Sequence, residues 1–258
     1  MPANILITGS NRGIGFGLVK RALRCKDVRH VFATCRNPKA ADELQLLHQS
    51  DQRVQVIQLD GTNDRSIKAS VNEVSKIVGN QGLNLLINNA GISEGTFEAG
   101  SPSSFLGASQ GSYMSHFNIN SVAPVLITKE FLPLLTQASN SFSEKDVFSI
   151  HRAAVLNISS MLGSIEANTT GSANIKNLAY RMSKSALNQF GKNVSIDLKE
   201  RKILVASFCP GWVRTDMGTA SAELGVTQST EKLWETFLTL DESTTGAYLD
   251  RFGKQIAF

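Results

Sequence analysis

Tyr180 and Lys184 lie four positions apart in the chain. On a helix this spacing places both side chains on one face, one turn apart. A tyrosine has an unperturbed pKa of about 10, so it exchanges protons poorly near neutral pH. A nearby ammonium group favours the phenolate and lowers that pKa. We therefore predict a proton-transfer site for carbonyl or alcohol chemistry, in which a hydroxyl from Ser159 or Ser160 holds a substrate oxygen.

Such a site needs a hydride carrier, and the N-terminal region has the pattern of a dinucleotide-binding unit. Residues 5–7 form a short apolar run, as in parallel strands that are covered on both faces. A glycine-bearing loop follows at residues 8–15, and residues 16–23 space their apolar side chains as a helix does. Glycines let the backbone approach a pyrophosphate, which then faces the N–H groups of the helix N-terminus. An ordinary glycine-bearing turn is the alternative.

The second strand, expected at residues 30–34, indicates which dinucleotide is used. An NAD site places an acidic residue at the end of this strand, for the ribose hydroxyls. Here the chain continues with Cys35, Arg36 and Asn37 instead. Arg36, with Arg12 from the glycine loop, could form charge-assisted bonds to a 2′-phosphate. The pattern favours NADP(H), and the alternative is that both arginines are solvated surface residues.

The next two strands supply further polar groups. The third, at residues 54–59, ends at Asp60, whose carboxylate could accept a bond from an adenine amino group or cap the helix that follows near residue 64. The fourth, at residues 83–87, is followed by small residues and amides at 88–91, which suit a floor under a flat cofactor. Residues 92–113 are read as a loop or short helix over that cofactor.

Strand and helix patterns alternate along the rest of the chain. Helices are expected at 42–49, 66–78, 115–135, 180–200 and 232–240, and later strands at 153–158, 203–208 and 247–252. Residues 138–153 are read as a surface loop, and residues 215–227 as a mobile segment that faces the site. This alternation predicts an α/β fold: a single-domain doubly wound parallel sheet of about seven strands, with helices on both faces. Residues 1–258 would form one NADP-binding Rossmann domain, whose substrate-pocket segments lie near 92–113, 163–176 and 216–232.

Composition excludes several other classes of protein. The 258 residues are 41% hydrophobic and 19% charged, which is typical of a soluble globular protein. The net charge of +4 comes with no dense basic stripe, so we expect no nucleic-acid partner. Three cysteines without CxxC spacing argue for a reducing compartment and against a metal site. With no long apolar run, we expect a cytoplasmic protein that does not enter a membrane.

Five motifs, in the right order, resemble those of the short-chain dehydrogenase/reductase family over almost the whole chain. They are the glycine loop at 8–15, the segment 88–91, Ser160, the pair Tyr180 and Lys184, and the turn Pro210-Gly211. Segments 11–20, 34–37, 180–188 and 210–218 further resemble the carbonyl reductases that this family has in insects and nematodes.

The resemblance implies a role for each matching residue. Tyr180 would be the general acid in reduction, Ser160 would hold the carbonyl oxygen, and Lys184 would bind the nicotinamide ribose and lower the Tyr180 pKa. Asn120 would hold a water on a proton path to solvent. Strand alternation makes Ser159 the weaker candidate. The expected cofactor-binding set is Gly9, Ser10, Asn11, Arg12, Gly13, Ile14, Gly15, Arg36, Asp60, Asn89, Ala90, Gly91, Tyr180, Lys184, Pro210, Gly211, Val213 and Thr215.

The expected function is therefore the NADPH-dependent reduction of a small carbonyl compound: an aldehyde, a ketone or a quinone. Two alternatives stay open: an NADP-dependent alcohol or steroid dehydrogenase, and a non-catalytic protein that senses NADP(H) and recruits partners. Many family members place the serine about a dozen residues before the tyrosine, whereas Ser160 and Tyr180 are 20 apart here. The longer segment 163–176 is expected to wall the substrate pocket. The family often pairs through the helices that carry Asn120 and Tyr180, so a homodimer is also expected.

Overall fold

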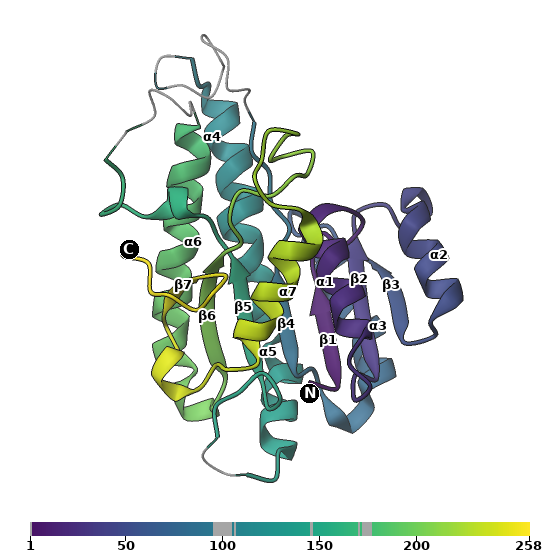
Figure 1. Cartoon of the computed structure of the whole chain (residues 1–258). Helices are drawn as coiled ribbons and strands as arrows, with labels where there is room; N and C mark the ends of the chain where they lie inside the picture. Colours follow the sequence, from purple (N-terminus) through teal and green to yellow (C-terminus); the bar gives the residue numbers. More distant parts are fainter. Residues whose placement is uncertain (1, 95–104, 106, 145–146, 170, 172–176) are drawn as a thin grey trace.

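Seven parallel strands form the single sheet of the computed structural model, which describes residues 2–94, 105, 107–144, 147–169, 171 and 177–258 (Figure 1). The strands are β1 (Asn4–Ile7), β2 (His30–Cys35), β3 (Val54–Gln58), β4 (Leu85–Asn88), β5 (Ala154–Ile158), β6 (Leu204–Cys209) and β7 (Tyr248–Asp250). Their order across the sheet is β3-β2-β1-β4-β5-β6-β7. The predicted doubly wound sheet is confirmed.

The strand order reverses between β1 and β4, which pair in parallel at the centre of the sheet. In such folds ligands bind outside the carboxyl ends of the strands at this point, because the loops from the two halves diverge there and leave a crevice. The glycine loop leaves β1 here, and the segment after Asn88 leaves β4. Both predicted cofactor motifs therefore start at the same crevice.

Helices cover both faces of the sheet (Figure 1). They are α1 (Gly13–Leu23), α2 (Asp42–Ser50), α3 (Asp64–Val78), α4 (Gln110–Phe117), α5 (Ala123–Ser141), α6 (Leu178–Asp197) and α7 (Val226–Phe237). One apolar cluster joins α1, α2 and α7 to one face, where Trp234 and Phe237 are fully buried. A second joins α3, α5 and α6 to the other face around Phe131. The strands are apolar on both sides because both faces are covered.

Two helices differ from the sequence prediction. The helix expected at 115–135 is interrupted: α4 begins at Gln110, a π-helical turn spans Asn118–Val122, and α5 continues to Ser141. Ser109 caps α4 by accepting a hydrogen bond from the Ser112 N–H, inside the stretch that was expected to be a loop or short helix. The helix expected at 232–240 is α7, Val226–Phe237, whose polar first turn hides its start from a search for apolar spacing.

The segment expected as a surface loop at 138–153 is anchored to the core. Phe148 and Ile150 are buried, and so is Arg152. The Arg152 guanidinium donates hydrogen bonds to the Ser139 hydroxyl and to the Val147 carbonyl. Within the described ranges, no helix is both long enough and apolar enough to cross a bilayer.

Candidate active site

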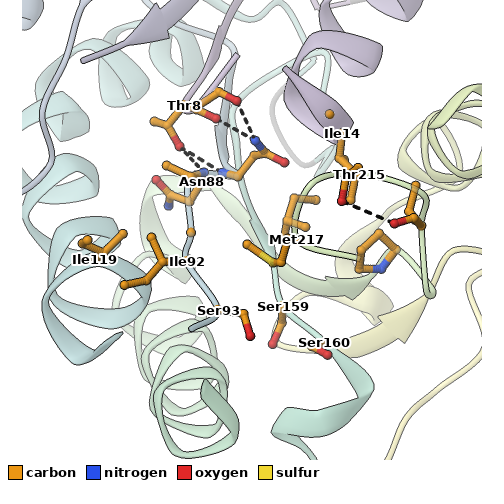
Figure 2. A pocket seen from close by; sticks show the side chains of 18 of the residues that line it. Thr8, Ile14, Asn88, Ile92, Ser93, Ile119, Ser159, Ser160, Thr215 and Met217 are labelled. Atoms are coloured by element: carbon orange, nitrogen blue, oxygen red, sulfur yellow. Dashed lines mark hydrogen bonds between the residues drawn. The ribbon is translucent and has the colours of Figure 1, made fainter. Parts of the chain in front are cut away.

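A cavity of about 1040 Å³ runs along the carboxyl ends of the central strands. Arg36 and Asp60 line it on the side of β2 and β3, and Tyr180 and Lys184 line it on the side of α6. In the view of Figure 2, Thr8 and Ile14 lie toward one end of the cavity, Ser159 and Ser160 lie toward the other, and Met217 lies between them. The glycine loop and the proton-transfer residues therefore share one space.

The glycine loop has the geometry of an anion cradle. Gly9 and Gly13 have φ angles of +66° and +57°, which side chains rarely tolerate. A Cβ on Gly15 would lie 2.3 Å from the Gly9 carbonyl oxygen, so only glycine lets α1 begin this close to the loop. The N-cap residue, Arg12, makes no side-chain capping bond, and the first turn of α1 carries no acidic residue. The N-terminus of α1 is thus open to a negatively charged ligand.

The segment after β4 braces this loop from behind. The Thr8 hydroxyl accepts hydrogen bonds from the backbone N–H groups of Asn89 and Ala90, each 2.9 Å long (Figure 2). The Asn89 side-chain amide donates to the carbonyls of Thr8, at 2.8 Å, and Gly9, at 3.2 Å. The Asn89 side chain therefore holds the start of the glycine loop against the segment after β4.

On the side of the glycine loop and β2, the two predicted arginines differ in their contacts. Arg36 is exposed, lines the cavity and forms no ion pair with any residue that the structure describes. Arg12 instead pairs with Asp216, 2.7 Å away, in the loop after β6. Because both partners of that pair are largely exposed, it is weak enough to open for a ligand.

Asp60 lines the cavity, and its carboxylate accepts hydrogen bonds from the backbone N–H and the hydroxyl of Thr62. The alternative role considered for Asp60, the cap of the following helix, belongs to Asn63. The Asn63 side chain accepts from the Ser66 N–H at 3.1 Å at the start of α3.

The predicted proton-transfer residues lie together on one wall. Tyr180 and Lys184 are buried on α6, with the Lys184 Nζ 5.7 Å from the centre of the Tyr180 ring. The Lys184 ammonium donates to the Ile158 carbonyl at 2.8 Å, which ties α6 to the end of β5. The Ser160 hydroxyl lies close enough to the Tyr180 phenol to lower its pKa. The Ser159 hydroxyl is occupied elsewhere, since it donates to Asn188 Oδ1 at 2.7 Å.

The predicted site residues fall into two groups. Most of them line the cavity, including Ser160, Pro210, Gly211, Val213 and Thr215. Three predicted residues lie behind its wall: Ser10 donates its hydroxyl to the Ile7 carbonyl, Gly15 packs against Gly9, and Asn120 is fully buried.

The three predicted pocket segments contribute unequally. Ile92 and Ser93 come from the first, whose residues 95–104 and 106 lie outside the described part of the chain. Met217, Gly218 and Val226 come from the third. In the second, residues 163–169 and 171 do not line the cavity, and residues 170 and 172–176 lie outside the described part.

Comparison with known proteins connects this geometry to a family. The sequence profile of the short chain dehydrogenases matches residues 3–224. The chain belongs to the short-chain dehydrogenase/reductase family. Curated relatives include an uncharacterized oxidoreductase of Schizosaccharomyces pombe, 31% identical over 228 residues, which are 88% of this chain and 80% of the relative. The chain is accordingly an oxidoreductase of this family.

Solved structures give the same result and add detail. The carbonyl reductase Sniffer of Drosophila melanogaster is 36% identical, with a TM-score of 0.92 and full coverage of both chains. A Caenorhabditis elegans protein assigned as a Sniffer carbonyl reductase is 42% identical, with a TM-score of 0.86 and coverage of 100% of this chain and 99% of the other. A carbonyl reductase from chicken fatty liver, with NADPH bound, is 34% identical, with a TM-score of 0.91 and coverage of 100% and 99%. The predicted resemblance to carbonyl reductases of insects and nematodes is confirmed.

Burial dominates the electrostatics of Tyr180. It raises the pKa of Tyr180 to about 12, against a smaller lowering by Ser160. A lowering of this pKa by Lys184, as the resemblance implies, stays a prediction. Burial also lowers the pKa of Lys184 to about 8. Both shifts arise because charged forms are poorly solvated inside the wall. The consequence is a tyrosine that keeps its proton at neutral pH.

The lowered pKa of Lys184 makes the stability of the protein depend on pH. Between pH 8 and pH 10.5 the unfolded chain holds a proton at Lys184 that the folded chain has released, so the free energy of unfolding rises with pH in this window. Lys184→Met removes this titration. From pH 8 to pH 10 we expect the wild type to gain about 1 to 3 kcal/mol relative to the variant. Urea denaturation at a series of pH values measures this difference.

The matched control is Lys199→Met, because Lys199 is exposed and pairs with Glu242 at 3.2 Å on the surface. Over the same pH range, the free energy of unfolding of Lys199→Met should change with pH as that of the wild type does. If the free energies of unfolding of the wild type and Lys184→Met change with pH in the same way, Lys184 keeps its ordinary pKa in the folded protein.

Asn120 occupies the π-helical turn, a feature that is often found at functional sites. Its Oδ1 accepts from the Ile92 N–H at 2.8 Å, and its Nδ2 donates to the Ile92 carbonyl at 2.8 Å and to the Ser183 hydroxyl at 3.0 Å. The side chain thus joins the segment after β4 to α6, directly beside the turn that bears Tyr180 and Lys184.

Sequence reasoning missed the contribution of the C-terminal segment. The buried Tyr248 donates its hydroxyl to the Ser160 backbone carbonyl. The Ser164 hydroxyl donates to the Ala257 carbonyl at 2.6 Å, and the Glu166 N–H donates to the Phe258 carbonyl at 2.9 Å. The end of the chain therefore holds the segment that carries Ser160. No sequence signal connects these residues, because 88 positions separate Tyr248 from Ser160.

Proposed function

We propose that this protein is an NADPH-dependent carbonyl reductase, which reduces an aldehyde, a ketone or a quinone. The observation that carries the proposal is that Ser160, a buried Tyr180 and Lys184 line one end of the same cavity that the glycine loop lines at the other. The 34% identity to a carbonyl reductase with NADPH bound supports it.

The cofactor assignment is supported by the chemistry of the groove. The cradle at the start of α1 fits a pyrophosphate, because its open N-terminus favours negative charge and the glycines at positions 9 and 13 let the backbone approach the ligand closely. Arg36 is free to pair with a 2′-phosphate, and Arg12 joins it when its ion pair with Asp216 opens. When bound, NADPH supplies the hydride, and the protein supplies position and proton.

The proton comes from Tyr180 in this scheme. The Ser160 hydroxyl orients the carbonyl oxygen toward the phenol, and Tyr180 donates its proton to that oxygen as negative charge develops there. The buried Lys184 ammonium lies one turn away and stabilises the phenolate that remains. Asn120 holds the backbone on which this wall rests, and we propose that a water near it returns the proton from solvent.

The cofactor supports reduction over the alternative, alcohol oxidation. The exposed Arg36 favours the phosphorylated nucleotide NADP(H). Cells usually keep NADP pools reduced, which favours reduction of a carbonyl over oxidation of an alcohol.

The function is tested by incubating the purified protein with NADPH and a panel of quinones, aldehydes and ketones, while the nicotinamide absorbance is followed. We expect absorbance to fall with at least one carbonyl class, and NADH to be a poorer donor. Tight NADPH binding with no turnover of any carbonyl would contradict the proposal, and would favour the alternative of a protein that senses NADP(H).

A further inference from the structure

Arg251 places a positive charge at the proton-transfer end of the cavity. It follows β7, whose last residue, Asp250, pairs with Cys209 at the end of β6. The Arg251 guanidinium lies against the turn after Cys209: a Cβ built on Gly211 would be 2.8 Å from its Nη1. Arg251, Cys209 and Gly211 all line the cavity, as does Tyr180.

The guanidinium of Arg251 is held in place without being neutralised. It stacks on the Phe252 ring, 4.3 Å from the ring centre, which fixes its plane and leaves the N–H groups at its edge available. Among the residues that the structure describes, none accepts a hydrogen bond from it or forms an ion pair with it. The neighbouring Asp250 uses its Oδ1 to accept from the N–H groups of Phe252 and Lys254.

Each of the other cationic side chains that line the cavity either has a partner in the protein or is assigned to the cofactor phosphate. Arg12 pairs with Asp216, and Arg214 donates to the carbonyls of Ala222 and Glu223. Lys184 donates to the Ile158 carbonyl. Arg36 lies beyond β2, on the side assigned to the cofactor phosphate. Arg251 is therefore a cation at the substrate end that the proposed cofactor site does not use.

Besides Arg251, the cavity has apolar side chains in its lining. Met161, Trp212 and Met217 line the same cavity with side chains that are each about half exposed. The Trp212 ring is fixed, because its Nε1 donates to the Gly218 carbonyl at 2.7 Å. Methionine side chains adapt to ligands of different shape. Such a wall suits a substrate with an apolar or aromatic body.

We propose that Arg251 makes the substrate end selective for carbonyl compounds that carry a carboxylate on an apolar body: oxo acids and formyl acids. The carboxylate would accept bonds from the free edge of the guanidinium, while the body packs against Trp212 and the methionines. This inference rests on the proposed carbonyl reductase function and names its substrate class. The nearby Asp250 weakens the attraction for an anion, so the expected selectivity is moderate, about 10- to 100-fold.

The test compares two aldehydes of similar shape, one anionic and one neutral: para-formylbenzoate and its methyl ester. With saturating NADPH, we expect the wild type to have a kcat/KM about 10- to 100-fold higher for the acid. Arg251→Gln should bring this ratio close to one, mainly through the KM of the acid, and leave turnover of the ester within about twofold. Arg251→Lys, which keeps the charge without the planar fork, should give an intermediate ratio.

Lys254→Gln is the matched control, since it removes one positive charge from the same exposed turn but lies outside the cavity lining. It should keep the wild-type ratio. A measurement on the wild type alone guards against a variant that fails to fold: benzoate should inhibit reduction of the ester at lower concentration than benzamide does.

The possible results separate the two proposals. Equal kcat/KM for acid and ester in the wild type, or an unchanged ratio in Arg251→Gln, would overturn the role of Arg251 and leave the carbonyl reductase function intact. NADPH binding with turnover of neither aldehyde, nor of any other carbonyl in the panel, would overturn both.

Discussion

Replacing Tyr180 with phenylalanine is expected to lower kcat by about 100- to 10,000-fold, the usual contribution of a positioned general acid. The ring stays in place on α6, so the change removes only the hydroxyl beside Ser160. Affinity for NADPH should stay within about twofold, since the phosphate cradle and Arg36 are untouched. Stopped-flow measurement of carbonyl reduction, together with titration of NADPH binding, separates these two effects.

Tyr113→Phe is the matched control for this variant. Tyr113 lies on α4 and is not among the residues that line the cavity, so loss of its hydroxyl should leave kcat near that of the wild type. If Tyr180→Phe retains most of the wild-type kcat, the proton comes from another donor and the assignment of Tyr180 is wrong.

The second large effect is expected at the cofactor end. Arg36→Asp replaces an unpaired guanidinium with a carboxylate beside the proposed 2′-phosphate site. Loss of charge-assisted hydrogen bonds alone corresponds to about 1.5 to 3 kcal/mol, and the new charge repels the phosphate. We expect the Kd for NADPH to rise about 100-fold or more, while the Kd for NADH changes less than about threefold. Fluorescence titration with the two nucleotides measures the ratio.

Lys39→Asp reverses a charge on the same side of the molecule without touching the cavity lining, so it controls for long-range electrostatics. It should alter NADPH binding only slightly, and less at high salt, because exposed charges are screened. An equal loss of NADPH and NADH affinity in Arg36→Asp would show that Arg36 contacts a part common to both nucleotides, and that the 2′-phosphate lies elsewhere.

Local sequence patterns predicted the parallel strands and the glycine loop of this protein well. Short apolar runs such as residues 5–7 identified buried parallel strands, since a strand that is covered on both faces has no polar alternation. The glycine loop could be recognised from the sequence because Gly9, Gly13 and Gly15 occupy positions where a positive φ angle or a close neighbouring atom excludes other residues. Such constraints act over a few residues, so a short sequence pattern is enough to predict them.

Helix boundaries were predicted less well, again for a local reason. Capping groups begin α4 at Ser109 and α7 at Gly225, where the Gln228 side chain accepts from the Gly225 N–H. These starts carry few apolar residues, so apolar spacing locates the middle of each helix and misses its first turn.

The sequence alone determined the sheet, the cradle and the types of the reacting side chains. Only the tertiary structure decided their electrical state: burial raises the pKa of Tyr180 and lowers that of Lys184, and burial is a property of the packed wall. It also decided what surrounds Ser160 and the substrate. Tyr248 and Arg251 reach the site from the end of the chain, because β7 lies beside β6 in the folded sheet, and no spacing along the sequence records that neighbourhood.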